Sequence, residues 1–194
     1  MNHNDIVRQS FKKQAEKFVA YHMSKVEYTD YLIQKIAATG EEHALEVAAG
    51  TCICGRALAP YVKDITCLDM TEEMLAQGIR LAEESHIENI YFQSGNAEKL
   101  PYEPETFDLV ITRLSFHHFD NPEKPFEEMK RVLKKGGKMV VWDMELPRSL
   151  YEKLMIRLKI CVILLIPESS AGKNLKKCSR KILHCNAKKL LWCR

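Results

Sequence analysis

Apolar and polar positions follow two patterns along this chain, one typical of helices and one typical of buried strands. In the first forty residues, apolar side chains recur at helical spacing in two sets: Phe11, Ala15, Phe18 and Val19, then Tyr28, Tyr31, Leu32 and Ile36. After residue 40, short apolar runs that suit buried strands are separated by helical patterns. These runs predict strands near residues 44–48, 64–68, 90–93, 107–112 and 138–142.

Capping and turn residues mark the helices between these strands. Pro60 ends a helix over residues 52–60, and Gly136-Gly137 is expected to end a helix whose first residues are Asn121-Pro122. Thr71 suits the N-cap of a further helix, because its hydroxyl can accept a hydrogen bond from a free amide of the first turn. Helices and strands therefore alternate along residues 41–142.

This alternation predicts an α/β fold, a doubly wound parallel sheet with helices on both faces. Such sheets bind ligands at the carboxyl ends of their strands. The segments that directly follow the predicted strands are therefore the candidate site: residues 48–54, 69–71, 95–98, 113–118 and 143–146.

Two of these segments have features of a nucleotide-type cofactor site. Small residues between Ala48 and Cys52 would let the backbone approach a ligand closely. Asp69 lies 23 positions beyond Glu46, and an acid about 20 residues along commonly accepts hydrogen bonds from ribose hydroxyls. A plain turn and a helix-capping acid would produce the same features, so both interpretations stay open here.

Three more stretches make the pattern specific: GNAEKLP at 95–101, TFDLV at 106–110 and RVLKKGG at 131–137. In this order, over roughly residues 5–154, the chain resembles the class I S-adenosylmethionine-dependent methyltransferases. It is most similar to the ubiquinone/menaquinone-biosynthesis type, the methyltransferase type 11 domain. A nicotinamide-dependent dehydrogenase is disfavoured, because these motifs are not its pattern.

The resemblance implies a Rossmann-like methyltransferase core at residues 41–154 and an N-terminal helical cap at residues 1–40. The implied cofactor is S-adenosyl-L-methionine, and the implied reaction is methyl transfer to a small-molecule acceptor, with no nucleic acid as partner. An alternative is an inactive remnant that only binds the cofactor.

The resemblance also assigns contacts to single residues. It places Asp69 on the ribose hydroxyls, Met70 on adenine, Asn96 and Ala97 at the amino edge of adenine, and Arg113 against the cofactor at the end of strand four. The implied cofactor-binding set is Glu46, Ala48, Gly50, Thr51, Cys52, Asp69, Met70, Asn96, Ala97 and Arg113.

Two residues depart from the family pattern. Ala49 and Cys52 stand where the quinone-type members have glycines. If the backbone at Cys52 has a positive φ, its Cβ costs about 1–2 kcal/mol. We also expect the Cys52 thiol to point at the methionine tail of the cofactor.

Methyl transfer needs little from the protein beyond alignment, because the sulfonium carbon is already activated. A base is needed only if the acceptor must lose a proton. His118, and less so His117, follow strand four and are the candidate bases or acceptor-orienting groups; lining a pocket is their alternative role. We expect no metal site, because the histidine pair lacks carboxylates at ligand spacing.

The composition changes abruptly near Leu154. Residues 155–194 carry ten Lys or Arg, one acid and four of the seven cysteines, a net charge of +9 against −6 for residues 1–154. This tail does not resemble the family's sixth and seventh strands, which are therefore expected to be missing. Its shifted codon phase permits a family-like segment, DKIEDMRDPSHTR, so we interpret the tail as out of frame. A basic arm that binds polyanions is the alternative.

The cysteine content, the short apolar runs and the polar N-terminal segment favour a cytoplasmic location. The longest apolar run, at 160–166, is too short to span a bilayer, and the N-terminal segment lacks the apolar core of a secretory signal. The odd number of cysteines, without paired metal-site spacing, predicts free thiols.

Overall fold

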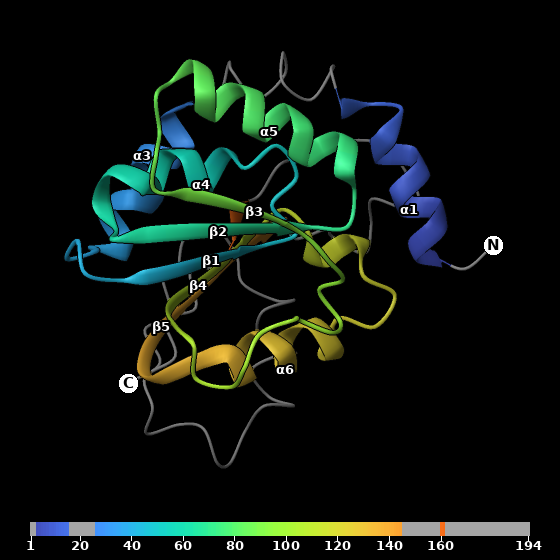
Figure 1. Ribbon diagram of the computed structural model, residues 1–194. Coiled ribbons are helices and arrows are strands. Elements are labelled where there is room, and N and C mark those ends of the chain that lie inside the picture. The colour runs from blue at the N-terminus through green and yellow to red at the C-terminus, as the bar shows by residue number, and fades with distance from the viewer. Residues whose placement is uncertain (1–2, 16–25, 145–159, 162–194) are drawn as a thin grey trace.

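A central sheet organises the protein, whose computed structural model describes residues 3–15, 26–144 and 160–161. The strand order is β3-β2-β1-β4-β5-β6 (Figure 1). The first five strands pair in parallel and β6 pairs antiparallel with β5. Their bounds are β1 His43–Val47, β2 Asp64–Asp69, β3 Ile90–Ser94, β4 Phe107–Arg113, β5 Leu133–Met144 and β6 Ile160–Cys161. The predicted doubly wound parallel sheet is confirmed.

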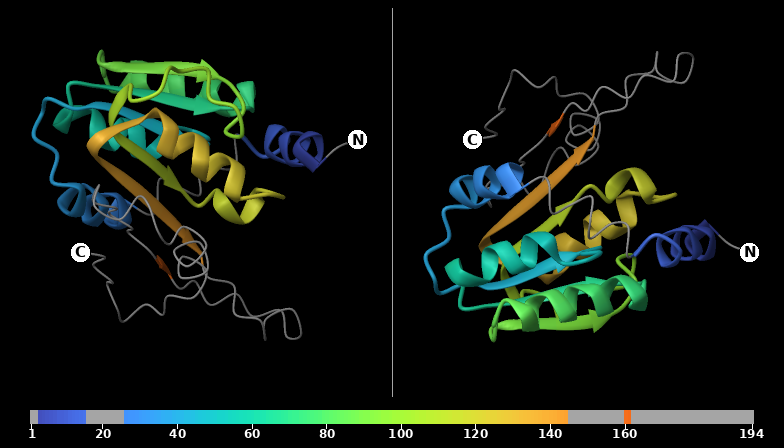
Figure 2. Two further views of the ribbon diagram at one scale, coloured as in Figure 1. Left: turned by 90° about the horizontal axis from the view of Figure 1, so that it is seen from below. Right: turned by 90° about the horizontal axis from the view of Figure 1, so that it is seen from above.

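Helices cover both faces of this sheet. They are α1 His3–Lys12, α3 Val26–Ile36, α4 Ile53–Leu58, α5 Glu72–Glu84 and α6 Glu123–Val132, with the 3-10 turns η1 Ala59–Tyr61 and η2 Phe116–His118. Helices α3, α4 and α5 lie on one face and α6 on the other (Figures 1 and 2). Among the described helices, none is long and apolar enough to cross a bilayer.

The central strands explain why both faces need covering. Ala44 and Glu46 of β1 face the α3–α5 side, whereas Leu45 and Val47 face α6, and all four are buried. The strands are therefore nearly continuous apolar runs, as expected where a parallel sheet is covered twice.

The junction between α6 and β5 differs from the prediction. Helix α6 ends at Val132, and Gly136-Gly137 lie inside β5 instead of ending the helix. Gly136 has φ +76°, and the pairing with β4 shifts register between Phe107 and Leu109. A Cβ on Gly137 would lie 2.9 Å from the Asp108 carbonyl oxygen. The glycines therefore serve an irregular strand start, and not a helix C-cap.

The two ends of the chain are described only in part. The predicted helical content of residues 1–40 is confirmed at α1 and α3, whereas Phe18 and Val19 lie outside the described residues. In the tail, Ile160–Cys161 pairs with Asp143–Met144, so strand five has a neighbour there. The rest of the 155–194 interpretation lies outside the described residues.

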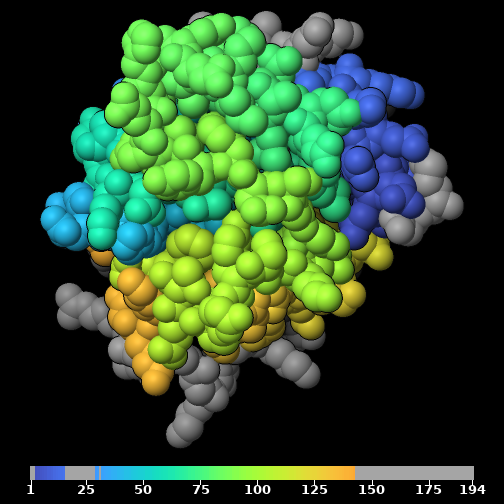
Figure 3. Space-filling model, viewed as in Figure 1, coloured from blue at the N-terminus to red at the C-terminus, as the bar shows by residue number. Residues whose placement is uncertain are grey.

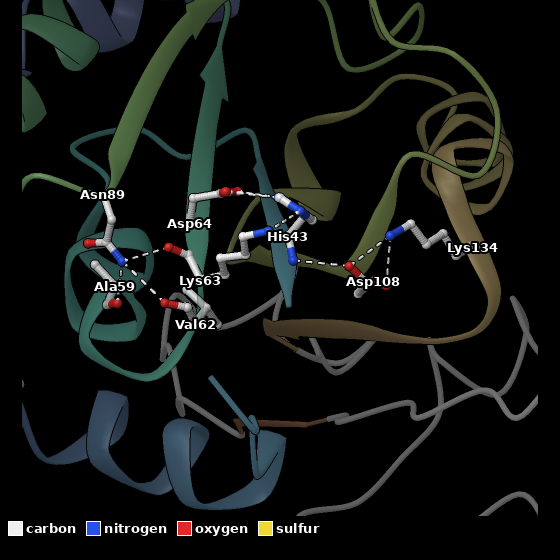
Figure 4. A network of polar contacts seen from close by, with 8 residues as sticks. All are labelled: His43, Ala59, Val62, Lys63, Asp64, Asn89, Asp108 and Lys134. Carbon is white, nitrogen blue, oxygen red and sulfur yellow. Dashed lines mark hydrogen bonds and ion pairs between the residues drawn. The ribbon is translucent and has the colours of Figure 1, made fainter. Parts of the chain in front are cut away.

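A polar network ties the amino ends of the strands together (Figure 4). His43 Nδ1 is 2.8 Å from a carboxylate oxygen of Asp64, and its backbone amide donates to Asp108 at 3.1 Å. Lys134 then donates to Asp108 at 2.9 Å. These contacts hold together the amino ends of β1, β2, β4 and β5. They therefore lie at the edge of the sheet opposite the carboxyl ends, where the candidate site is.

Candidate cofactor site

Backbone in the left-handed region shapes the turn after β1. Ala48, Gly50 and Cys52 have φ of +54°, +55° and +56°. The turn is closed by a hydrogen bond that the Cys52 amide donates to the Ala49 carbonyl oxygen at 2.8 Å. Residues other than glycine disfavour this region, so the condition stated for Cys52 is met, and its Cβ carries the cost of about 1–2 kcal/mol.

Asp69 links this turn to the end of β2. Its two carboxylate oxygens accept hydrogen bonds from the Gly50 amide at 2.7 Å and the Thr71 amide at 2.8 Å. Burial raises the pKa of the Asp69 carboxyl, against these two bonds, which lower it. The two oxygens of a carboxylate can together accept about four hydrogen bonds, and the two amides provide two of them.

Thr71 occupies the N-cap position of α5, as predicted, but its hydroxyl does not cap the helix. Its side chain instead contributes to lowering the pKa of the Asp69 carboxyl. The capping prediction is therefore correct in position and wrong in mechanism. The first turn of α5 keeps its two acids, Glu72 and Glu73, which suit the positive end of the helix dipole.

Glu46 holds the start of α4 from the neighbouring strand. Its side chain is 2% exposed and accepts hydrogen bonds from the Gly55 amide at 2.7 Å and the Cys67 thiol at 3.5 Å. The N-cap residue of α4, Cys52, supplies no side-chain cap. Burial raises the pKa of Glu46 to about 7, against these hydrogen bonds and the charge of Arg113, which lower it.

The Cys52 thiol does not point where the sequence suggested. Cys52 is 0% exposed, and a Cβ placed on Gly78 of α5 would lie 2.8 Å from its sulfur. The sulfur is also 3.7 Å from the Gly50 carbonyl oxygen. The thiol therefore packs into the core against α5, and the expected approach to a methionine tail is wrong. Cys52, Cys54 and Cys67 are free thiols, as predicted for them.

The segment after β3 lies against the same edge. The Gly95 amide donates to the Asp69 carbonyl at 3.0 Å, which joins this segment to the end of β2. Asn96 Oδ1 accepts the Glu98 amide at 2.8 Å, so its side chain closes a turn. Ala97 is 5% exposed and packs in the core on the α6 side.

Beyond β4, the chain makes a second strained turn. Leu114 has φ +52° and donates its amide to the Trp142 carbonyl. Next to it, Arg113 has a buried Nε without a hydrogen-bond partner among the described residues. The Ser115 hydroxyl, which is buried, bonds that of Thr112. Strain of this kind clusters at functional sites.

The histidine pair lies on η2, beside α1. The His117 and His118 ring centroids are 3.9 Å apart. His3 of α1 bonds the His118 carbonyl oxygen at 2.8 Å, and the Phe11 ring meets the His118 ring edge-on at 4.9 Å. No group of three or more metal-ligating side chains occurs among the residues whose structure is described.

Helix α1 thereby bridges two sides of the candidate site. At its other end Lys12 forms an ion pair with Glu73 in the first turn of α5. Figures 2 and 3 show α1 beside the start of α5, at the edge toward which the strands run. These contacts give α1 a defined position, which the sequence did not reveal.

Comparison with known proteins decides the family. The methyltransferase domain family matches residues 45–141, which span the five parallel strands up to β5. The chain belongs to the methyltransferase domain family. S-adenosylmethionine is the cofactor of this family, and the predicted family and cofactor are confirmed at that level.

Relatives of this methyltransferase domain are identical to it at about a third of the aligned positions. It is 33% identical to the uncharacterized methyltransferase YcgJ of Bacillus subtilis over 118 residues, which cover 61% of this chain and 47% of YcgJ. It is 34% identical to the demethylmenaquinone methyltransferase of Alkalihalophilus pseudofirmus over 109 residues, 55% of this chain and 46% of that enzyme. The methyltransferase domain thus spans about half the length of these curated relatives.

Solved structures agree with this fold. The crystal structure of YcgJ matches with a TM-score of 0.60 at 32% identity, covering 63% of this chain and 53% of YcgJ. The PH0226 protein of Pyrococcus horikoshii OT3 matches with a TM-score of 0.61 at 30% identity, covering 69% and 62% of the two chains. The sheet and its flanking helices are therefore those of the family.

The site of this methyltransferase domain fits the family's cofactor. The turn after β1 presents small residues, and its one thiol is turned into the core. Asp69 retains acceptor capacity for ribose hydroxyls. Sequence reasoning missed that Gly78 accommodates Cys52. It also missed that Glu128 and Arg131 of α6 form hydrogen bonds with the backbone of Leu100 and Tyr102, in the segment after β3. The RVLKKGG motif begins with Arg131 and was the sequence signal that could have pointed to this residue.

Proposed function

We propose that the chain binds S-adenosylmethionine at the carboxyl ends of β1 to β4 and transfers its methyl group to a small-molecule acceptor. One observation carries the cofactor assignment. The carboxylate of Asp69 is fixed by the Gly50 and Thr71 amides, and its backbone carbonyl oxygen accepts the Gly95 amide, which supports Asp69 as the acceptor for the ribose hydroxyls. Membership of the methyltransferase family supports the reaction class.

When bound, S-adenosylmethionine supplies a methyl group on a positively charged sulfur. Asp69 accepts the ribose hydroxyls, Met70 packs against adenine, and Asn96 and Ala97 meet its amino edge. The turn after β1 approaches the methionine moiety through its backbone. The proposed cofactor contacts are thus Glu46, Ala48, Gly50, Thr51, Cys52, Asp69, Met70, Asn96, Ala97 and Arg113.

The acceptor side is formed by η2 and α1. His118 orients the acceptor or takes its proton, with His117 as the second candidate. His118 suits this role because its ring contacts Phe11 of α1, which fixes its orientation. Helix α1 also excludes water from the reacting centre, since it reaches both η2 and α5.

A ligand comparison tests the ribose assignment. Asp69→Ala frees two backbone amides as well as the ribose site, so its affinity alone is ambiguous. S-adenosylhomocysteine and its 2′,3′-dideoxy analogue are therefore titrated against both proteins. The parent should prefer the hydroxylated ligand by about tenfold or more, the value of one to two hydrogen bonds to a charged group. In Asp69→Ala this preference should disappear.

An unchanged preference in Asp69→Ala would refute the ribose role. Cofactor binding without turnover is the remaining alternative, and transfer of a labelled methyl group distinguishes it. A chain that binds S-adenosylmethionine but never releases S-adenosylhomocysteine, over a panel of quinol, phenol and amine acceptors, would be a binding-only remnant.

A further inference from the structure

Arg131, in the last turn of α6, holds the segment that follows β3. Its Nη1 donates to the Tyr102 carbonyl at 2.7 Å, and its Nη2 donates to the Leu100 carbonyl at 3.0 Å. These bonds span about 30 residues of sequence, so they are tertiary contacts. Figure 1 shows this segment running along α6.

Glu128 completes the arrangement from one turn earlier on α6. Its Oε2 accepts the Leu100 amide at 2.8 Å, and both carboxylate oxygens accept Arg131, at 2.8 and 2.7 Å. The backbone of Leu100 is thus held at its amide by Glu128 and at its carbonyl by Arg131. We call Glu128 and Arg131 the α6 clamp.

The charges of the clamp favour this geometry. The hydrogen bond with Arg131 lowers the pKa of Glu128, and the same bond raises the pKa of Arg131. Both side chains are partly buried, at 22% and 34% exposure. The neighbouring pair Lys130–Glu127 has the same spacing on α6, but it is 3.7 Å apart and more exposed. In the described part of the chain this pair forms no hydrogen bond to the segment after β3, so it is a matched control for the clamp.

The held segment is the one proposed to meet adenine. A turn closed by the Asn96 side chain joins Asn96 to Lys99, directly before Leu100. Ala97 and Leu100 are buried in one core cluster with Met129 of α6. The Asn96 side-chain oxygen already accepts the Glu98 amide, so it is engaged within the turn. The backbone amides and carbonyls of this segment are then the groups that would form hydrogen bonds with the edge of adenine.

We propose that Glu128 and Arg131 are positioning residues that set the adenine preference of the site by fixing the backbone of residues 96–100. This inference rests on the proposed function, because it assigns adenine to this segment. Adenine presents an amino donor where hypoxanthine presents a carbonyl acceptor. A backbone held in place presents a fixed donor or acceptor and so distinguishes adenine from hypoxanthine, whereas a mobile backbone can adapt to either base.

The test compares Arg131→Met with Lys130→Met as matched control. Amide hydrogen exchange over residues 96–102 is measured without ligand, and S-adenosylhomocysteine and S-inosylhomocysteine are titrated. In Arg131→Met the exchange of this segment should accelerate about tenfold or more, and the preference for the adenine ligand should fall about tenfold. Lys130→Met should leave both within about twofold. A merely structural residue would change stability without changing the preference.

Unchanged exchange at residues 96–102 in Arg131→Met would overturn the inference, whether or not a ligand binds. An accelerated exchange with an undiminished adenine preference would overturn it too. If Arg131→Met does not fold, Glu128→Met gives the same test, because it removes the acceptor of the Leu100 amide. Failure of the proposed function has a different result, since the parent itself would then bind neither ligand.

Discussion

Cys52 occupies a backbone conformation that suits glycine, and Gly78 accommodates its thiol. From the sequence alone, a left-handed backbone at Cys52 was only a condition. The direction predicted for the thiol was wrong, because it depends on a helix that lies later in the chain. Since the thiol is turned into the core, it does not obstruct the cofactor side of the turn. We therefore expect Cys52→Gly to leave affinity for S-adenosylhomocysteine within about twofold.

A double-mutant cycle tests the packing of Cys52 against Gly78. Gly78→Ala should cost about 1–3 kcal/mol of unfolding free energy in the parent, because its Cβ would lie 2.8 Å from the thiol sulfur. In a Cys52→Gly background the same change should be close to neutral. The helix preference of alanine over glycine, about 1 kcal/mol, is then offset by the remaining 3.2 Å approach of the new Cβ to the Thr51 carbonyl oxygen. Urea unfolding measures both. Equal losses in the two backgrounds would show that the thiol lies elsewhere.

At the scale of elements, α4 begins without a cap of its own and depends on Glu46 of β1. The pKa of Glu46 is raised to about 7, above its ordinary value near 4.5. The folded state therefore holds the proton more tightly than the unfolded chain. This contribution to stability is complete below about pH 4.5 and is lost as the pH rises through about 7.

Glu46→Gln keeps the carbonyl acceptor for the Gly55 amide and removes the titration. Between pH 4.5 and 8, the unfolding free energy of the parent should fall relative to that of Glu46→Gln by about 3 kcal/mol. Chemical unfolding across this range measures the difference. Parallel pH profiles for the two proteins would contradict a raised pKa at Glu46.

Helix α1 contacts η2 through Phe11 and α5 through Lys12. Phe11→Ala removes the ring contact with His118, and edge-on aromatic pairs contribute about 0.5–1.5 kcal/mol. We expect S-adenosylhomocysteine to dissociate about threefold to tenfold faster, as measured by stopped-flow fluorescence. Gln14→Ala is the control, since Gln14 lies just beyond α1 and its side chain bonds Ser10 of that helix. Equal dissociation rates in both variants would mean that α1 does not cover the ligand.

Across the whole molecule, the features that depend on local sequence patterns could be predicted from the sequence. The five parallel strands, their order of alternation with helices and the family follow from apolar runs and short motifs. Contacts between distant segments were not predictable, as with Arg131 and Leu100, or Glu46 and Gly55. The out-of-frame interpretation of residues 155–194 and the roles of His117 and His118 stay predictions.

The central claim is that this fold holds S-adenosylmethionine at the carboxyl edge of its sheet, and calorimetric titration of the full chain tests it most directly. S-adenosylmethionine and S-adenosylhomocysteine should each bind with one molecule per chain, while the nicotinamide dinucleotide NAD should produce no binding heat. A chain that is folded by circular dichroism but binds neither sulfur ligand, or that binds NAD in their place, would contradict the account.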